Sequence, residues 1–370
     1  MKYTLKMNQL MPQVINIYVL GFNQALASSI TGVIDLFALA GVTWNRIQQD
    51  EPNQVFKVKL ASQQAKNIEC INGLNLAAHI SFDQLIQQTQ TENSDSRETT
   101  HIQAGIAHKP ISKPISTTRN ILIVPTIGGP IQQVLDQSQS LMILLQKAHQ
   151  AGWTIAGNCT GNFLLGQAGI LDNKIATTHW GFEREFRQRF PKVDLQAQQL
   201  ITRDENIYCA GGGITWFDLG LHIIERNVNF ETAIQTAKAF VIDYRRDNQL
   251  SYSLLRLSNA HQDEVVKKIQ NTIEQQFNQA FNLDQLATQF NLSQRSLIRR
   301  FNKAIGMPPI TYVQAIRIER AQKMLEETEH SIEYIMNTIG YEDTSSFRRL
   351  FKKRTGSTPT EYRNRFSRRL

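Results

Sequence analysis

The C-terminal part of the chain contains the same pattern twice, and this internal repeat constrains the fold more than any other feature. When the sequence is laid on itself with an offset of 50 residues, seven identities fall in register. The identical pairs are Ser296/Ser346, Arg299/Arg349, Phe301/Phe351, Lys303/Lys353, Gly306/Gly356, Pro309/Pro359 and Tyr312/Tyr362. A repeat of this kind indicates that one supersecondary unit has been used twice.

Each copy has the pattern of a helix, a tight turn and a second helix. In the first copy, apolar residues recur at helical spacing over residues 283–290, and Ser293 is placed to cap the next helix. We expect that helix to bury Leu297, Ile298 and Phe301. The second copy follows the same plan with one extra residue in its turn, because the two copies align at an offset of 49 before the turn.

The turn of the second copy contains Gly340, where a backbone without Cβ strain is useful. Asp343 or Thr344 is placed to cap the helix that follows. A helix pair with a basic second helix suits the major groove of DNA, although an ordinary helical hairpin with solvated arginines is the alternative. The connecting helix, roughly Pro309–Glu327, spans about 28 Å. This length is near the ~34 Å turn of B-DNA, so two copies favour binding in successive major grooves.

Residues 283–366 resemble the DNA-binding domain of the AraC/XylS family of transcription regulators. The resemblance rests on the stretches GMPPITYVQAIRIERAQKMLEE and SIEYIMNTIGYEDTSSFRRLFKKRTGSTPTEYR, which are highly specific to that family. It implies that Arg295, Arg299, Ser345 and Arg349 read bases, and arginine can bind guanine O6 and N7 with two hydrogen bonds. The expected DNA contacts are Gln294, Arg295, Ser296, Arg299, Arg300, Thr344, Ser345, Arg348, Arg349, Lys352 and Lys353.

The first two thirds of the chain alternate strand-like and helix-like segments. This alternation predicts an α/β sandwich with a mostly parallel sheet. Within it, Gln, Thr, Ser and Asn dominate residues 87–120, where we expect a flexible insertion, with an ordered lid as the alternative. Cys159 lies between a predicted strand and a predicted helix, on a sharp turn typical of a nucleophile. The helix dipole would favour its thiolate, although close packing of a small residue is the alternative.

Residues 12–244 resemble the DJ-1/PfpI superfamily, specifically the amidase-like sensor domain of GlxA-type AraC regulators. The stretches NCTGNFLLGQAGILDNKIATTHW, NILIVPTIGG and AGGGITWFDLGLHII carry the resemblance. It implies a flavodoxin-like sandwich in which Cys159 matches the nucleophile or redox centre and His179 lies near it. By the same resemblance, Gly128 and Gly129 offer backbone amides as an anion hole.

The sequence departs from the catalytic pattern of that superfamily at two positions. Thr160 stands where hydrolytic members have a histidine, and Ser29 aligns with the expected acid. Hydrolysis then lacks its acid–base partners, so we expect no catalysis and a degenerate nucleophile position at Cys159 and His179. We predict instead a small-molecule pocket formed by Ser29, Gly128, Gly129, Cys159, Thr160 and His179.

Charge and cysteine content fit a DNA-binding protein in a reducing compartment. From His261 onward there are 18 Lys and Arg against 12 Asp and Glu, whereas the rest of the chain has 22 against 20. The basic excess suits phosphate contacts and salt-dependent binding. Three cysteines without a CxxC pair argue against disulfides and zinc. We expect no cofactor, no metal, no membrane association and a cytoplasmic location.

We therefore predict a DJ-1/PfpI-like sensor domain over residues 12–245, a linker over 246–260 and an AraC-type double helix-turn-helix domain over 261–370. The resemblances imply a sequence-specific transcription regulator, in the first instance an activator, that responds to a small molecule. Expected partners are promoter DNA, an unidentified effector and a second copy of the chain, with RNA polymerase as a further candidate. The alternative is a thiol-based stress sensor, or a residual amidase-type enzyme, that uses Cys159.

Overall fold

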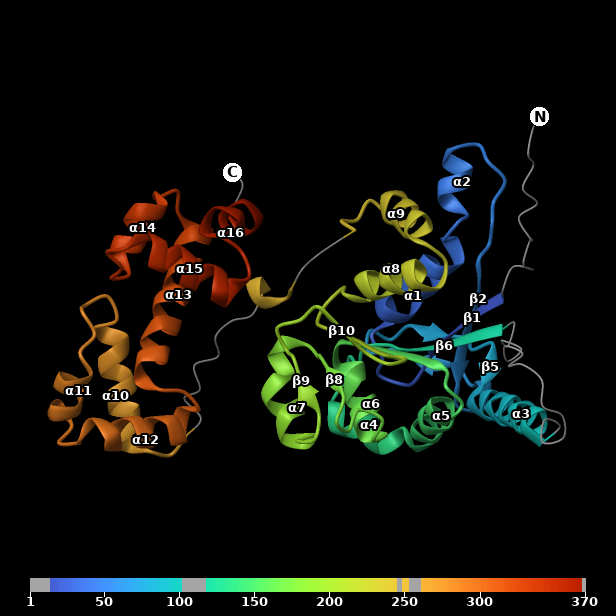
Figure 1. Cartoon of the computed structure of the whole chain (residues 1–370), viewed down its shortest axis with the longest axis horizontal. Coiled ribbons are helices and arrows are strands. Elements are labelled where there is room, and N and C mark those ends of the chain that lie inside the picture. Colours follow the sequence, from blue (N-terminus) through green and yellow to red (C-terminus); the bar gives the residue numbers. More distant parts are fainter. Residues whose placement is uncertain (1–13, 102–117, 245–247, 253–260, 368–370) are drawn as a thin grey trace, which may run out of the picture. The chain divides into compact units, whose positions relative to one another are not determined.

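The computed structural model describes residues 14–101, 118–244, 248–252 and 261–367, and it divides the chain into two compact units. The first unit covers Met1–Asn248 and the second covers Gln249–Leu370. Figure 1 shows the first as strands between layers of helices and the second as helices alone. Each unit is described by itself.

The first unit is built on a seven-stranded sheet in which every pairing but one is parallel. In spatial order the strands are β10 (Ile201–Asp204), β11 (Ile207–Ala210), β7 (Thr154–Asn158), β6 (Thr118–Val124), β1 (Val14–Leu20), β2 (Phe56–Ser62) and β5 (Ile80–Ser81). Only the edge strand β10 runs antiparallel to its neighbour. In the middle of the sheet, Ile17 pairs with Val58 on one side and Ile121 on the other. The predicted α/β fold with a mostly parallel sheet is confirmed.

Helices cover both faces of this sheet, as a parallel sheet with two buried faces requires. One face carries α1 (Ala27–Leu39) and α8 (Trp216–Asn227), with α9 (Phe230–Ala239) beyond them (Figure 1). The other face carries α3 (Phe82–His101), α4 (Ile131–Gln137), α5 (Gln139–Gln150) and α6 (Asn162–Gln167). Shorter elements are α2 (Thr43–Ile47), α7 (Glu183–Arg189), the β3–β4 hairpin (Ile68–Glu69 and Asn75–Leu76) and the β8–β9 pair (Ile175–Ala176 and Asp194–Leu195).

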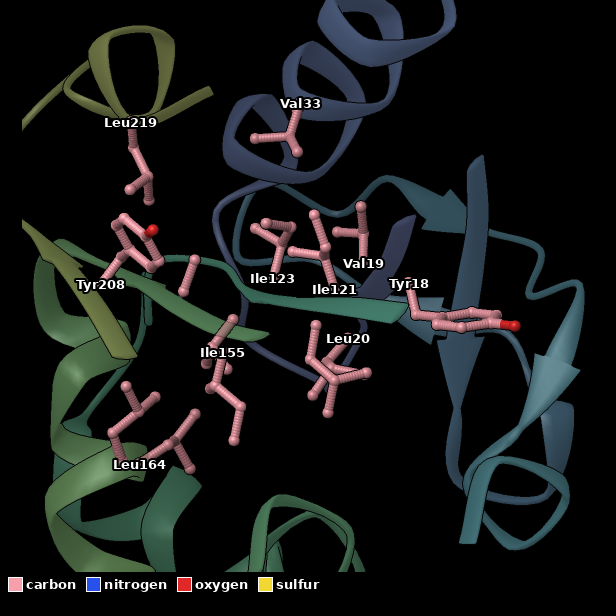
Figure 2. Close-up of a cluster of buried hydrophobic side chains, with 14 of the residues drawn as sticks. Tyr18, Val19, Leu20, Val33, Ile121, Ile123, Ile155, Leu164, Tyr208 and Leu219 are labelled. Carbon is pink, nitrogen blue, oxygen red and sulfur yellow. The ribbon is translucent and has the colours of Figure 1, made fainter. Parts of the chain in front are cut away.

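The core forms because successive side chains of a strand point to opposite faces. Val19 and Ile121 lie toward Val33 of α1, whereas Leu20 lies on the other side of the sheet, where Leu164 of α6 packs (Figure 2). All five side chains are buried. At the α1–α8 contact, a Cβ on Gly32 would lie 2.0 Å from the ring of Trp216, so only glycine lets the helices approach this closely.

Helix α3 differs from the irregular insertion predicted over residues 87–120. The helix continues to His101, and β6 already begins at Thr118. No Gly or Pro interrupts residues 82–101, which leaves the backbone free to remain helical. The remaining part of the predicted insertion, residues 102–117, lies outside the described residues.

The second unit contains helices in the described residues and no strands. They are α10 (Glu264–Gln275), α11 (Leu283–Gln289), α12 (Gln294–Ile305), α13 (Pro309–Glu327), α14 (Ile332–Thr338), α15 (Thr344–Thr355) and α16 (Pro359–Phe366). Two separate apolar clusters hold them together, one around Phe301 and one around Phe351. These two residues are paired in the sequence repeat, so each copy has its own core.

In the structure, each copy of the repeat includes one more helix than the sequence identities cover. Tyr312 of the first copy accepts a hydrogen bond from Gln270 and donates one to Glu274, over 2.9 and 2.8 Å. In the second copy, Tyr362 bonds in the same way to a Gln and a Glu, namely Gln322 and Glu326 of α13. Helix α10 is thus the counterpart of the C-terminal half of α13. Helix α13 therefore ends the first copy and begins the second.

The turns between the paired helices explain the offset of 49. Each contains one residue in the left-handed region, Asn291 with φ 54° and Gly340 with φ 82°. Ser293 caps α12 and Asp343 caps α15 by accepting bonds from backbone amides. One residue separates Asn291 from its cap, whereas two separate Gly340 from its cap, so the extra residue lies at this point.

Candidate functional site

Cys159 occupies a strained turn between β7 and α6. Its φ of 56° lies in the left-handed region, where a side chain is disfavoured. Two residues later the chain passes very close to the loop after β6, because a Cβ on Gly161 would lie 2.3 Å from the carbonyl oxygen of Pro125. The chain therefore leaves the strand abruptly and enters the helix, as the sequence predicts.

The thiol of Cys159 is enclosed, with only 5% of the residue exposed. Burial raises the pKa of this thiol, and hydrogen bonds from the Thr160 and Gly213 amides lower it by less. The sequence-based expectation of a favoured thiolate is therefore wrong in direction. The expectation counted the helix dipole and left out desolvation, which is the larger effect here.

A neutral hydrogen-bond network surrounds the cysteine at the ends of β6 and β7. Ser29 Oγ donates to the Leu26 carbonyl over 2.8 Å and accepts from the Thr126 amide over 3.1 Å. Thr126 Oγ1 accepts from Asn158 Nδ2 over 2.8 Å, and Asn158 Oδ1 accepts from the Thr215 hydroxyl over 3.0 Å. Ser29 therefore supports the loop beside the cysteine, and its hydroxyl does not replace the carboxylate of an acid.

Thr160 and His179 also form hydrogen bonds close to Cys159. Thr160 Oγ1 donates to the Ile127 carbonyl, and Thr178 Oγ1 donates to the Cys159 carbonyl, over 2.8 and 3.0 Å. His179 Nδ1 accepts a hydrogen bond from the Gly181 amide over 2.9 Å. The neutral ring then has its proton on Nε2, so neither nitrogen offers a lone pair to remove a proton from the thiol.

The two glycines predicted to form an anion hole pack against a neighbouring loop. The amides of Gly128 and Gly129 both donate to the Gln24 carbonyl, over 2.8 and 3.0 Å. A Cβ on Gly128 would lie 2.5 Å from Ile71, and one on Gly129 would lie 2.8 Å from the Gln24 side chain. Close approach of the chain accounts for both glycines, and the amides are not left to bind an anion. Sequence alone cannot show this, because Gln24 and Ile71 are distant in the chain.

The basic helices α12 and α15 carry the residues predicted to contact DNA. Within α12, Arg295 and Arg299 are exposed, and no ion pair or hydrogen bond to them is found in the described residues. Arg348 and Lys353 present the same exposed charge on α15, where Arg349 lies near Ser346 Oγ at 3.5 Å. The predicted residues that are less exposed are Ser296 and Thr344, while Ser345 and Lys352 are exposed.

Two of the predicted DNA contacts are bound to other helices of the protein or to their caps. Arg300 binds Asp263 with two hydrogen bonds, from Nε over 2.7 Å and from Nη2 over 2.9 Å. Gln294 Nε2 donates to Asp284 of α11. Asp263 also caps α10, and the bond from Arg300 holds the pKa of this carboxyl below its ordinary value. Arg300 therefore ties α12 to α10, a role that sequence reasoning missed.

Ile298 is a correction to the core predicted for α12. The sequence pattern places it beside Leu297 and Phe301 in the interior, but 36% of Ile298 is exposed while the other two are fully buried. Residue 298 lies between Arg295 and Arg299 along the helix, so it belongs to the surface that these arginines form.

Arg317 of α13 joins the two helix-turn-helix copies. It is only 9% exposed, and it donates to the carbonyls of Phe277 and Gln279 over 2.7 Å each and to that of Gly340 over 2.9 Å. Its guanidinium also lies 5.1 Å from the centre of the Tyr341 ring. The loop after α10 and the turn before α15 are thus held by one side chain.

The described residues offer neither a metal site nor a membrane-spanning helix. No group of three or more His, Cys, Asp and Glu side chains there is placed to hold a metal ion. Nor does any helix in that part of the chain combine the length and apolar composition needed to cross a membrane.

Each of the two units matches the model of a known protein family. A family model described as DJ-1/PfpI matches residues 40–226, just over half of the 370-residue chain. The chain therefore belongs to the DJ-1/PfpI family. A second model, described as a helix-turn-helix domain, matches residues 286–365. Both resemblances predicted from the sequence are confirmed.

Among individual proteins, the chain is similar to HTH-type transcriptional regulators. It is 27% identical to GbdR of Pseudomonas aeruginosa over 59% of this chain and 60% of GbdR. It is 24% identical to GlxA of Rhizobium meliloti over 64% of this chain and 73% of GlxA. A shorter match, 28% identical over 33% of this chain and 53% of the relative, is to isonitrile hydratase of Pseudomonas putida.

Proposed function

We propose that the chain is a sequence-specific DNA-binding transcription regulator whose DJ-1/PfpI-like domain binds a small molecule without converting it. The main support is the pair of basic helices α12 and α15, held in equivalent frames by the shared helix α13 and by Arg317. Exposed arginines on a helix that follows a tight turn suit readout in the major groove. The names of the relatives, which the chain matches over part of their length, support the same class.

The proposal assigns three parts to the chain. Residues 12–245 form the sensor domain, residues 246–260 the linker and residues 261–370 the DNA-binding domain. The regulator acts in the cytoplasm, as a homodimer and in the first instance as an activator that works with RNA polymerase. Binding of the effector shifts the equilibrium between states that differ in DNA affinity.

The test begins with the full chain and fragments of genomic DNA. Fragments retained by the protein are sequenced and footprinted, and protection of two adjacent major-groove segments is expected. Arg299→Ala or Arg349→Ala should then cost about 1–3 kcal/mol and relax the preference at one base pair. Lys323→Ala is the matched control, because Lys323 is an exposed cation of the same unit on α13. Equal binding to all fragments, or discrimination unchanged in both arginine variants, would overturn the proposal.

The groups around Cys159 do not support turnover of a bound molecule. The thiol is enclosed and has a raised pKa, Ser29 replaces the acid, and the lone pair of His179 Nδ1 is used by Gly181. Nucleophilic catalysis needs a base beside the sulfur and a carboxylate to orient it. The relatives named as regulators support this interpretation, whereas the partial match to isonitrile hydratase keeps the enzyme alternative testable.

The thiol-sensor alternative has its own experiment. Redox-sensing cysteines are accessible and have a low pKa, and the Cys159 thiol has neither property. We expect iodoacetamide to modify Cys159 slowly at pH 7 in the native protein, as measured by mass spectrometry, and Cys159→Ser to keep the response of DNA binding to the effector. Rapid modification at pH 7, together with loss of that response in Cys159→Ser, would favour the sensor.

A further inference from the structure

A cavity of about 150 Å³ lies in the first unit, away from the cysteine. Gly21, directly after β1, and Ser62, the last residue of β2, both line it. The start of α3 and the α4–α5 junction complete the wall on the side of the sheet where α3 and α5 lie (Figure 1). None of its lining residues belongs to the hydrogen-bond network around Cys159.

The position of this cavity is the one where open parallel sheets bind ligands. After β1 the chain continues to β2 on one side, and later adds β6 on the other side of β1. The strand order therefore reverses at β1, and ligands of such sheets bind outside the carboxyl ends of the strands at this reversal. Residues that follow β1, β2 and β6 all contribute to the cavity.

The apolar residues that line the cavity form its floor, and more than half of the lining residues are polar, namely Asn23, Ser62, Gln63, Lys66, Asn67, Gln137, Ser138 and Ser140. Phe22, Ile68, Phe82 and Leu141 line it and are buried, whereas Lys66 is exposed at its edge. Close packing forms the floor, because a Cβ on Gly21 would lie 1.8 Å from Ile68. An occupant therefore needs an apolar body with a polar group at one end.

The charge at the opening selects the kind of polar group. Lys66 is the only charged residue among those that line the cavity. Ser140 lies in the first turn of α5, which has no acidic residue there and no side-chain cap on its amides. Lys66 and the positive end of the twelve-residue α5 favour an anion, and the negative end of the seven-residue α4, which meets α5 at Ser138, partly opposes them.

We propose that this cavity is the effector site, and that it binds a small organic carboxylate with an apolar body about the size of a benzene ring. The volume of about 150 Å³ equals that of a cavity known to hold one benzene molecule, so an apolar body of this size fits beside the polar lining residues. The carboxylate is bound by Lys66 and the N-terminus of α5, and the body rests on the floor around Phe22 and Ile68. The inference rests on the proposed function only where it calls the ligand an effector.

The probe is sodium benzoate, with benzamide as its neutral analogue of the same shape. Saturation-transfer NMR on the full chain should show contact with benzoate and much weaker contact with benzamide. Lys66→Gln should weaken benzoate binding about tenfold, since a hydrogen bond to a charged group is lost. Lys57→Gln removes an equally exposed charge from β2 outside the cavity and should change nothing.

A second variant places bulk in the cavity and leaves the charge alone. Ser140→Trp, on the partly exposed first turn of α5, should abolish benzoate binding while circular dichroism stays that of the native chain. Binding retained in Ser140→Trp and Lys66→Gln would overturn the site. Equal binding of benzoate and benzamide would overturn the assignment of a carboxylate, and no binding of either would overturn the inference as a whole.

DNA binding separates this inference from the proposed function. Benzoate should change the affinity of the full chain for its selected DNA fragment, and Ser140→Trp should remove that change. Specific DNA binding without benzoate binding would contradict the assignment of the cavity as the effector site, and the proposal of a transcription regulator would stand. Benzoate binding at the cavity without any sequence-specific DNA binding would support the cavity as a ligand site and overturn the proposal of a transcription regulator.

Discussion

Cys209 shows how a buried residue makes stability depend on pH. It is 1% exposed on β11, and burial raises the pKa of its thiol from 9.0 to about 12. A raised pKa in the folded state means that deprotonation favours the unfolded chain. The stabilising contribution is therefore complete below pH 9 and is lost as the pH rises toward 12.

We expect the free energy of unfolding to fall by about 1.4 kcal/mol per pH unit between pH 9 and 12 because of Cys209 alone. Urea unfolding followed by tryptophan fluorescence measures it, since all four tryptophans lie in the first unit. Cys209→Ala is the comparison, because Cys70, Cys159 and the tyrosines titrate in both proteins. Equal pH dependence in the two proteins would contradict the assignment.

Ile298 is an apolar side chain in a row of charged ones, and its position suits a thymine methyl group in the major groove. We expect the protein to lose about 0.8 kcal/mol, or fourfold in affinity, when the thymine it contacts is replaced by deoxyuridine. Scanning each thymine of the footprint by gel shift finds the position. The same scan with Ile298→Ala should show no loss there; a loss of the same size would place another residue on that methyl group.

At the scale of the elements, Arg317 determines how the two copies are joined. Its three carbonyl partners lie in the loop after α10 and the turn before α15, and Gly340 packs there so closely that a Cβ would lie 2.3 Å from the Asn278 carbonyl oxygen. Removing one guanidinium leaves three carbonyls without a donor. Arg317 therefore adds to α13 a second connection between the two copies, from the loop after α10 to the turn before α15.

Arg317→Ala should destabilise the second unit by about 2–4 kcal/mol, since three bonds from a buried charged donor to partly buried carbonyls are lost. Hydrogen exchange measured by mass spectrometry should show faster exchange at residues 277–279 and 340. Lys323→Ala, an exposed cation six residues later on the same helix, is the control and should leave both segments protected. Identical exchange in the two variants would mean that Arg317 does not join the copies.

The sequence predicts elements well where one helix or strand carries its own signal. Helix α13 begins and ends at the predicted residues, Pro309 and Glu327, because proline starts it and the apolar period continues throughout. The identities at an offset of 50 also locate both capped turns, since caps and left-handed residues are local features.

What the sequence does not predict depends on contacts between distant residues. The bond between Arg300 and Asp263 spans 37 positions, and the contact of Gly128 with Gln24 spans about a hundred. The cavity is likewise formed by loops that come together only when β1, β2 and β6 align. Desolvation of Cys159 belongs to the same class, because it depends on everything packed around the thiol.

At the scale of the whole molecule, charge is concentrated where DNA is expected to bind. Residues from His261 onward hold an excess of six basic over acidic side chains, 18 against 12, whereas the rest has an excess of two, 22 against 20. Each lysine or arginine that neutralises a phosphate releases a counterion, so affinity for every sequence falls as salt rises.

Lys353→Ala should lower the slope of log affinity against log salt by about 0.9. The loss should be the same for selected and random DNA, because a phosphate contact carries no sequence information. Fluorescence anisotropy over a salt series measures the slope. Lys59→Ala, which removes an exposed charge from β2, should leave it unchanged. A loss confined to the selected sequence would instead make Lys353 a base-reading residue.

The sharing of α13 between the two copies limits how this protein can evolve. One residue added to the helix would rotate everything after it by about 100° and move it by about 1.5 Å. The second basic helix would then face away from the groove that the first one implies. The spacing of the two DNA segments that the proposed function assigns to α12 and α15 is therefore fixed by the architecture. New target sites can arise through substitutions on α12 and α15, but not through a gradual change in the distance between them.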